Sequence, residues 1–267
     1  MEKELTVKTF DGIELRGRVD FPDTPKAVCL VIHGIAEHYG RYDYLTDKLN
    51  TAGFAVVRFD QRGHGRSDGR PVYYSDYTEI IKDIDLLVKT AREEFGDLPL
   101  FIIGHSMGGF GAVVYGTANP GKADAYIISG ALTRSTKRNP LLDSPLDDDA
   151  YVPNGLGGSI CSDSEVVAAY AADPLVAKEL SVKIIRAMNA GIDWLKESAE
   201  LFVDPILILH GANDRNISPK ESLLFFDEIA SSDKSLRIYS DLMHDVFNER
   251  AKDRVIRDAI EWMDDRS

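Results

Sequence analysis

The stretch Phe101-Ile102-Ile103-Gly104-His105-Ser106-Met107-Gly108-Gly109 decides the fold that we predict for this chain. An apolar, β-forming run leads into Gly104, and small residues that suit a closely packed helix follow Ser106. A sharp turn from strand to helix exposes the serine hydroxyl, and the flanking glycines remove side chains that would collide there. The N–H groups at the start of the helix point to where negative charge would develop. We predict that Ser106 is a nucleophile.

The same Gly-x-Ser-x-Gly pattern occurs a second time, at Gly65-Arg66-Ser67-Asp68-Gly69. Here Gly63 and His64 precede the pattern instead of an apolar strand, and Pro71 follows too soon for a helix to begin comfortably. We interpret Ser67 as a loop residue.

Apolar runs and helical patterns alternate along the rest of the chain. Strands are predicted over residues 5–10, 13–19, 27–33, 54–59, 100–103, 125–129, 206–210 and 236–239. Helices are predicted over residues 42–52, 77–95, 108–118, 219–230 and 246–263. This alternation predicts an α/β fold with a mostly parallel sheet covered by helices on both faces. Asp11-Gly12 predicts a two-residue hairpin turn, which would add antiparallel strands at one edge.

The alternation stops between residues 131 and 202, where no strand is predicted. We expect residues 1–130 and 203–267 to form the core domain and residues 131–202 to form an inserted, mainly helical cap over the strand ends. Four apolar residues of the insert recur at helical spacing: Ile185, Met188, Ile192 and Leu195. We predict that they bind the acyl part of a substrate. The alternative is a helical layer that only packs on the core.

A serine nucleophile requires a base, and an acid that orients the base. On a strand–turn–helix scaffold of this kind the order along the chain is serine, acid, histidine. His244 lies in a loop between the last predicted strand and helix, whereas His210 ends a strand and is interpreted as structural. Asp214 leaves the tip of that strand and is our predicted acid, with Asp241 as the runner-up.

Acyl transfer also needs two N–H donors for the developing oxyanion. One donor belongs to the residue after the nucleophile, Met107, and the other to the loop after an early strand. Gly34 lets the loop after strand 27–33 turn inward, so we predict that the N–H of Ile35 is the second donor. Each such donor typically contributes about 2.7–4 kcal/mol in the transition state.

Several segments resemble the monoacylglycerol lipase and lysophospholipase group of the α/β-hydrolase superfamily, the serine aminopeptidase S33 type. The segments are residues 33–42 (HGIAEHYGRY), 60–67 (DQRGHGRS), 104–109 (GHSMGG), 210–214 (HGAND), 166–170 (VVAAY) and 173–176 (DPLV). The resemblance implies the α/β-hydrolase fold and a carboxylester hydrolase that acts on single-chain lipid esters without a cofactor. One departure is Ile35-Ala36, where some members carry smaller residues. A branched side chain there would narrow the space for the substrate.

Composition limits the remaining functions. A formal net charge of -13 over 267 residues disfavours nucleic acids and anionic lipid headgroups as partners. No apolar run is long enough to span a membrane, so any membrane or micelle contact is expected to be transient. Cys29 and Cys161 need not pair, the first ten residues do not resemble a signal peptide, and we expect a cytoplasmic protein. No group of residues has the spacing of a metal site, so no metal is expected.

Two alternative functions remain open at this point. One is an esterase that acts on short-chain or aryl soluble esters with the same three residues. The other is a non-catalytic ligand-binding protein with this fold, which the intact set of Ser106, Asp214 and His244 disfavours.

Overall fold

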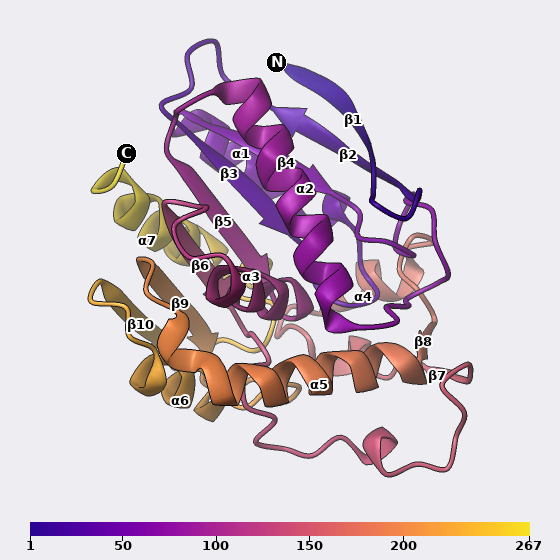
Figure 1. Cartoon of the computed structure of the whole chain (residues 1–267). Helices are drawn as coiled ribbons and strands as arrows, with labels where there is room; N and C mark the ends of the chain where they lie inside the picture. Colours follow the sequence, from indigo (N-terminus) through magenta and orange to yellow (C-terminus); the bar gives the residue numbers. More distant parts are fainter.

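A computed structural model describes residues 1–267 and contains one eight-stranded sheet in the order β1-β2-β4-β3-β5-β6-β9-β10. All neighbouring strands from β4 to β10 are parallel, and β1 and β2 add an antiparallel hairpin at one edge (Figure 1). The fold is that of an α/β-hydrolase. The strands are β1 (Glu2–Lys8), β2 (Glu14–Asp20), β3 (Ala27–Ile32), β4 (Phe54–Phe59), β5 (Leu100–His105), β6 (Ala125–Ser129), β9 (Ile206–Gly211) and β10 (Lys234–Tyr239).

Helices cover both faces of the sheet because successive residues of each buried strand point to opposite sides. Leu30, Ile102 and Ile128 belong to a core shared with α2 (Tyr77–Phe95), α3 (Met107–Ala118), α5 (Val182–Ser198) and α6 (Lys220–Glu228). Val31 and Ile103 belong to a second core, which they share with α1 (Asp43–Thr51) and α7 (Lys252–Asp264). Figure 1 shows α2 and α3 in front of the sheet and α5 across the lower part of the view.

Several predicted element boundaries differ from those of the structure, most of all at the first hairpin and the last helix. The β1–β2 connection spans residues 9–13 instead of two residues. At its ends the Thr9 N–H donates to the Ile13 carbonyl oxygen at 2.9 Å, and the Thr9 hydroxyl accepts the Ile13 N–H at 2.9 Å. The last helix begins at Lys252 instead of residue 246. The residues between form turns, in which the buried Glu249 carboxylate accepts the Met243 N–H at 3.0 Å.

The segment between β6 and β9 is the insert noted in the sequence. It contains α4 (Ser164–Ala172), α5, and three short 3₁₀ helices (Pro140–Leu142, Gly157–Ser159 and Ala199–Leu201). It also contains a two-stranded antiparallel sheet of β7 (Tyr151–Pro153) and β8 (Glu179–Ser181), so the prediction that it holds no strand is wrong. Strands of three residues are too short to give an alternating pattern in the sequence.

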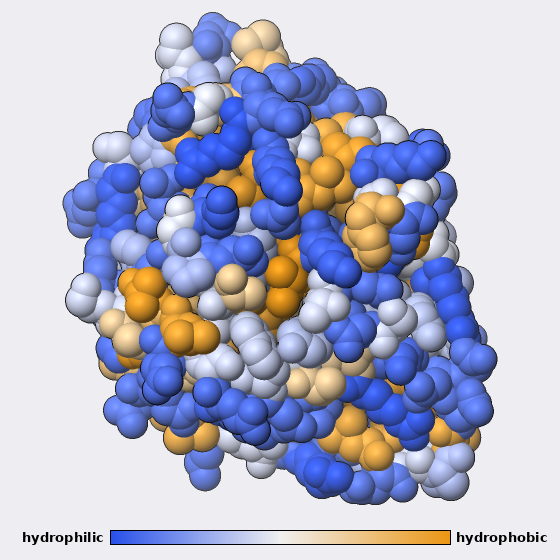
Figure 2. Space-filling model, viewed as in Figure 1, coloured by the Kyte–Doolittle hydropathy of each residue, from blue (hydrophilic) through white to orange (hydrophobic).

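The helices and the surface bear on membrane contact. None of the helices is both long and apolar enough to cross a lipid bilayer. Figure 2 shows a face made mostly of hydrophilic residues, interrupted by small apolar patches. Cys29 and Cys161 are both buried and unpaired.

Candidate active site

Ser106 lies at the turn between β5 and α3 in a backbone conformation that side chains rarely adopt, with φ 53° and ψ -115°. Such a conformation typically costs about 1–3 kcal/mol and must be supported by its surroundings. A Cβ on Gly104 would lie 2.4 Å from the Gly108 carbonyl oxygen, and one on Gly108 would lie 2.2 Å from the Ile32 carbonyl oxygen. The close approach of these backbones therefore requires both glycines of the motif.

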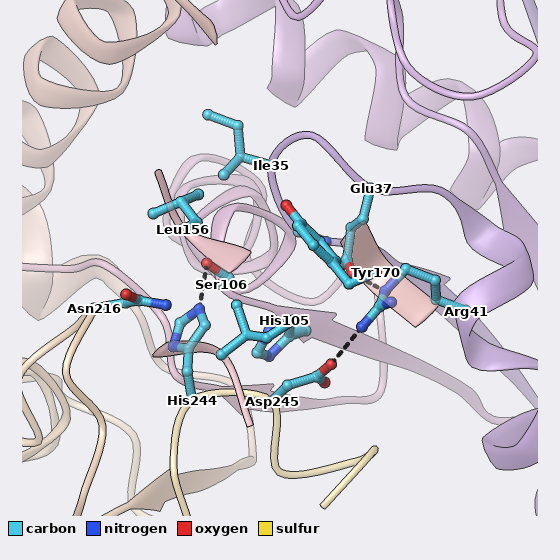
Figure 3. Close-up of a pocket in the computed structure, with 12 residues that line it drawn as sticks. Ile35, Glu37, Arg41, His105, Ser106, Leu156, Tyr170, Asn216, His244 and Asp245 are labelled. Atoms are coloured by element: carbon cyan, nitrogen blue, oxygen red, sulfur yellow. Dashed lines mark hydrogen bonds and ion pairs between the residues drawn. The ribbon is translucent and has the colours of Figure 1, made fainter. Parts of the chain in front are cut away.

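The structure brings Ser106, His244 and Asp214 together at the carboxyl ends of the parallel strands. His244 Nε2 lies 3.0 Å from Ser106 Oγ, and His244 Nδ1 lies 2.7 Å from Asp214 Oδ2. Figure 3 shows the contact between the serine and the imidazole. Asp214 comes from the turn after β9 and His244 from the loop after β10, so residues far apart in sequence meet at one edge of the sheet.

The Asp214 carboxylate is held by four hydrogen bonds and is fully buried. Oδ1 accepts the N–H groups of Asn216 and Ile217, both at 2.8 Å, and Oδ2 contacts Nε2 of His210 at 3.1 Å in addition to His244. Burial raises the pKa of Asp214, but the bonds from the two histidines outweigh it and hold this pKa well below its ordinary value. Asp214 is therefore ionised at neutral pH.

The environment of His244 favours its protonated form. Burial lowers the pKa of this imidazole. The hydrogen bond to Asp214 and the negative charge of Asp214 raise the pKa by more than burial lowers it, so the net shift is upward. The ring of His105 lies 4.7 Å from that of His244, and burial lowers the pKa of His105. His105 Nδ1 lies 2.9 Å from the Ser129 hydroxyl, so this second histidine is neutral and held in place. Of the two rings, only that of His244 is in reach of Ser106.

The residues that we set aside in the sequence have other contacts. Asp241, the runner-up acid, is exposed and accepts a hydrogen bond from Arg254 at 2.7 Å, and it does not contact His244. The Ser67 hydroxyl donates to the Asp60 carbonyl oxygen at 2.5 Å and accepts the Arg16 N–H at 2.8 Å. Ser67 therefore joins β2 to the loop after β4.

The two predicted backbone donors belong to the loop after β3 and to the residue after Ser106. Gly34 brings the loop after β3 so close that a Cβ on it would lie 3.2 Å from the Ser106 Cβ, and the Gly34 N–H donates to Glu37 Oε1 at 2.6 Å. The N–H groups of Ile35 and Met107 take part in no hydrogen bond within the chain. Both are therefore available to a developing oxyanion.

A small cavity adjoins Ser106, His244 and Ile35 (Figure 3). Its lining combines Ser106 and His244 with residues of the β3 loop, the insert and the loops after β9 and β10. The lining residues are Gly34, Ile35, Glu37, Arg41, His105, Ser106, Leu156, Ile160, Tyr170, Asn216, His244 and Asp245.

One wall of the cavity is a closed polar network. Arg41 Nε donates to Glu37 Oε2 at 2.7 Å, and Arg41 Nη2 donates to Asp245 Oδ2 at 2.8 Å. The Arg41 guanidinium also lies 4.9 Å from the centre of the Tyr170 ring, which belongs to the insert. Sequence reasoning missed this wall, because its members come from the segment after β3, helix α4 and the loop after β10, which share no pattern in the sequence.

The four apolar residues predicted to bind an acyl chain are not in this cavity. Ile192 and Leu195 are buried in the core shared with α2 and α3. Ile185, Met188 and Ile192 line a separate small cavity beside Leu132. The insert reaches Ser106 with Leu156, Ile160 and Tyr170 instead, so acyl binding by the four residues of α5 stays a prediction.

The sheet order, the turn at Ser106 and the histidine and aspartate on later loops define the chain as an α/β-hydrolase. Residues 23–251 match the sequence model of the family described as serine aminopeptidase S33, and the chain belongs to this family.

Known relatives span nearly the whole chain. A monoacylglycerol lipase of Mycolicibacterium smegmatis is 36% identical over 261 residues, covering 94% of this chain and 93% of the relative. The phospholipase YtpA of Bacillus subtilis is 29% identical, covering 91% and 96%. The crystal structure of the Paleococcus ferrophilus monoacylglycerol lipase is 28% identical, with a TM-score of 0.84 and coverage of 96% and 99%.

Proposed function

We propose that this chain hydrolyses esters of single-chain lipids, monoacylglycerols or lysophospholipids, through an acyl-enzyme on Ser106. The chain is a carboxylic ester hydrolase by its family and its relatives. The observation that carries the proposed mechanism is the continuous chain of contacts from Ser106 Oγ through the His244 ring to Asp214. The relatives that are monoacylglycerol lipases and a phospholipase support a lipid substrate.

The geometry supports two half-reactions. Ser106 Oγ attacks the ester carbonyl carbon while His244 Nε2 takes its proton, and the carbonyl oxygen becomes an oxyanion facing the N–H groups of Ile35 and Met107. Asp214 stabilises the imidazolium. The alcohol leaves with the proton from His244, and water then attacks the acyl-enzyme in the same way, which releases the fatty acid and restores the Ser106 hydroxyl.

Residues 131–202 serve, in this proposal, as a cap that closes over the substrate. Leu156, Ile160 and Tyr170 bring the insert to the cavity around Ser106. The free space in this cavity is about 20 Å³, room for about one water molecule, so an acyl chain of any length requires movement of the insert. The second candidate function is hydrolysis of short-chain or aryl esters, for which a smaller movement would suffice.

Acyl binding by the α5 residues is a further part of the proposal. Met188 lines the apolar cavity within the insert. Met188→Glu should reduce kcat/KM on long-chain esters more than on acetate esters, because a charge there opposes a hydrocarbon chain. Equal losses on both esters would mean that the four apolar residues of α5 only pack on the core.

The two cysteines bear on the location of the chain in the cell. The unpaired Cys29 and Cys161 fit a reducing compartment, and we propose the cytoplasm. Cell fractionation with an antibody to the chain tests this, and recovery outside the cytoplasmic fraction would contradict it.

A side-by-side comparison of substrates tests the proposed function. Purified protein should give its highest kcat/KM on 1- or 2-monoacylglycerols or lysophospholipids and lower values on p-nitrophenyl acetate. A fluorophosphonate probe should label Ser106, and Ser106→Ala should abolish labelling. Turnover confined to short aryl esters would favour the second candidate, and absence of both labelling and turnover would contradict an enzyme with this site.

A further inference from the structure

Asn216 differs from every other residue that lines the cavity around Ser106. Its side-chain amide nitrogen, Nδ2, is buried and has no hydrogen-bond partner. No other lining residue carries a buried side-chain nitrogen or oxygen in that condition. A buried donor without a partner is costly and uncommon in folded proteins, so a group that completes its hydrogen bonding is expected.

The amide is held so that this donor faces the reacting groups. Asn216 Oδ1 accepts the Ser159 hydroxyl at 2.5 Å, and the Asn216 backbone N–H donates to Asp214 Oδ1 at 2.8 Å. Figure 3 shows the amide nitrogen on the side of the group that faces Ser106 and His244. The insert, through Ser159, and the turn that carries the catalytic acid therefore fix the direction of Nδ2 together.

We propose that Asn216 Nδ2 donates a hydrogen bond to a free hydroxyl oxygen on the alcohol part of the ester, and that Asn216 thereby sets a preference for polyol esters over simple alkyl esters. This inference rests on the proposed function, because it assumes ester cleavage at Ser106.

The other parts of the substrate do not supply the partner. The ester carbonyl oxygen is assigned to the N–H groups of Ile35 and Met107, and a hydrocarbon acyl chain has no hydrogen-bond acceptor. On the opposite wall, the Arg41 guanidinium already donates to Glu37 and Asp245. The alcohol part of the ester is therefore the remaining part of the substrate that carries hydroxyl oxygens. This part leaves beside His244, which protonates it.

A matched pair of substrates tests the proposal. A 1-monoacylglycerol and the n-propyl ester of the same fatty acid share three alcohol carbons and differ in two hydroxyls. Asn216→Leu keeps a similar volume and removes the donor, so it should lower the ratio of kcat/KM on the monoacylglycerol to kcat/KM on the propyl ester by about tenfold to a hundredfold. Asn216→Ala should lower the same ratio and guards against a packing defect that is specific to leucine.

Asn213→Leu is the matched control. Asn213 belongs to the same turn, but its amide donates to the Ser240 carbonyl oxygen at 3.0 Å and does not line the cavity. This control should keep the wild-type ratio. Equal losses on both substrates in the two Asn216 variants, with circular dichroism melting unchanged, would overturn the proposal and leave Asn216 a support for Asp214. If the wild type cleaves neither ester, the proposed function fails and this inference fails with it.

Discussion

Replacing Asp214 by asparagine tests the central part of the site, because it changes one atom in a group whose contacts are all defined. Two backbone N–H groups donate to Oδ1, so the amide oxygen of the asparagine should take that position. The amide NH₂ then faces His244 Nδ1, where the carboxylate oxygen stood at 2.7 Å. An NH₂ group there requires an unprotonated Nδ1, which places the proton on Nε2 and prevents it from accepting the Ser106 proton.

The expected loss in kcat is about 10⁴-fold, the effect typical of this substitution in a Ser–His–Asp triad. That factor corresponds to about 5.5 kcal/mol, since each tenfold change in rate is about 1.36 kcal/mol. Two terms contribute: the wrong tautomer, and loss of the carboxylate that stabilises the imidazolium. The second term is large here because both side chains are buried and water does not screen the pair.

The pH dependence gives an independent readout with a defined sign. Catalysis needs neutral His244, and the net shift of the pKa of His244 is above the ordinary value of about 6.5. The acidic limb of kcat/KM in the wild type should therefore have its midpoint above about 6.5. Asp214→Asn removes the main contribution that raises this pKa and leaves burial, which lowers it. The limb of the variant should move to lower pH.

The assay is kcat/KM against pH for wild type, Asp214→Asn and the control Asp241→Asn, with folding checked by circular dichroism. Asp241 is exposed and pairs with Arg254, so its variant should keep activity near the wild-type level and an unchanged limb. The assignment of Asp214 as the acid is refuted if Asp241→Asn, and not Asp214→Asn, causes the large loss of kcat/KM. It is also refuted if Asp214→Asn stays folded and leaves the limb in place.

Three further predictions address other parts of the molecule. Ser106→Ala should reduce esterase activity by about 10⁴-fold or more while Ser67→Ala keeps substantial activity, and the opposite result in steady-state assays would assign the nucleophile to the wrong motif. Leu195→Ala should lower the free energy of unfolding by about 2–5 kcal/mol in urea titrations, because this side chain is fully buried in the core; a loss below 1 kcal/mol would contradict that placement. Glu249→Leu removes the buried acceptor of the Met243 N–H, so it should both destabilise the protein by about 1–3 kcal/mol and lower kcat through the His244 loop; full activity with unchanged melting would argue against that role.

The sequence alone determined the parts of this protein that depend on local chemistry. The turn at Ser106 needs an apolar strand, two glycines and a helix start in immediate succession, and only one of the two Gly-x-Ser-x-Gly segments has them. The alternation of strands and helices predicted the parallel sheet. The order of the three residues, with the loop positions of His244 and Asp214, indicated the base and the acid before any contact was known.

Only the tertiary structure shows which of the residues that the sequence ranks are in contact. Asp214 and Asp241 each follow a predicted strand, but Asp214 meets the His244 imidazole and Asp241 pairs with Arg254. The four apolar residues of α5 have the spacing of a buried face. Spacing alone does not say whether such a face contacts a substrate or the core, and the fold places these residues largely against the core. No sequence pattern predicts that the amide nitrogen of Asn216 is buried without a hydrogen-bond partner. Periodicity and turns report what each segment does locally, whereas these questions depend on which distant loops meet at the strand ends.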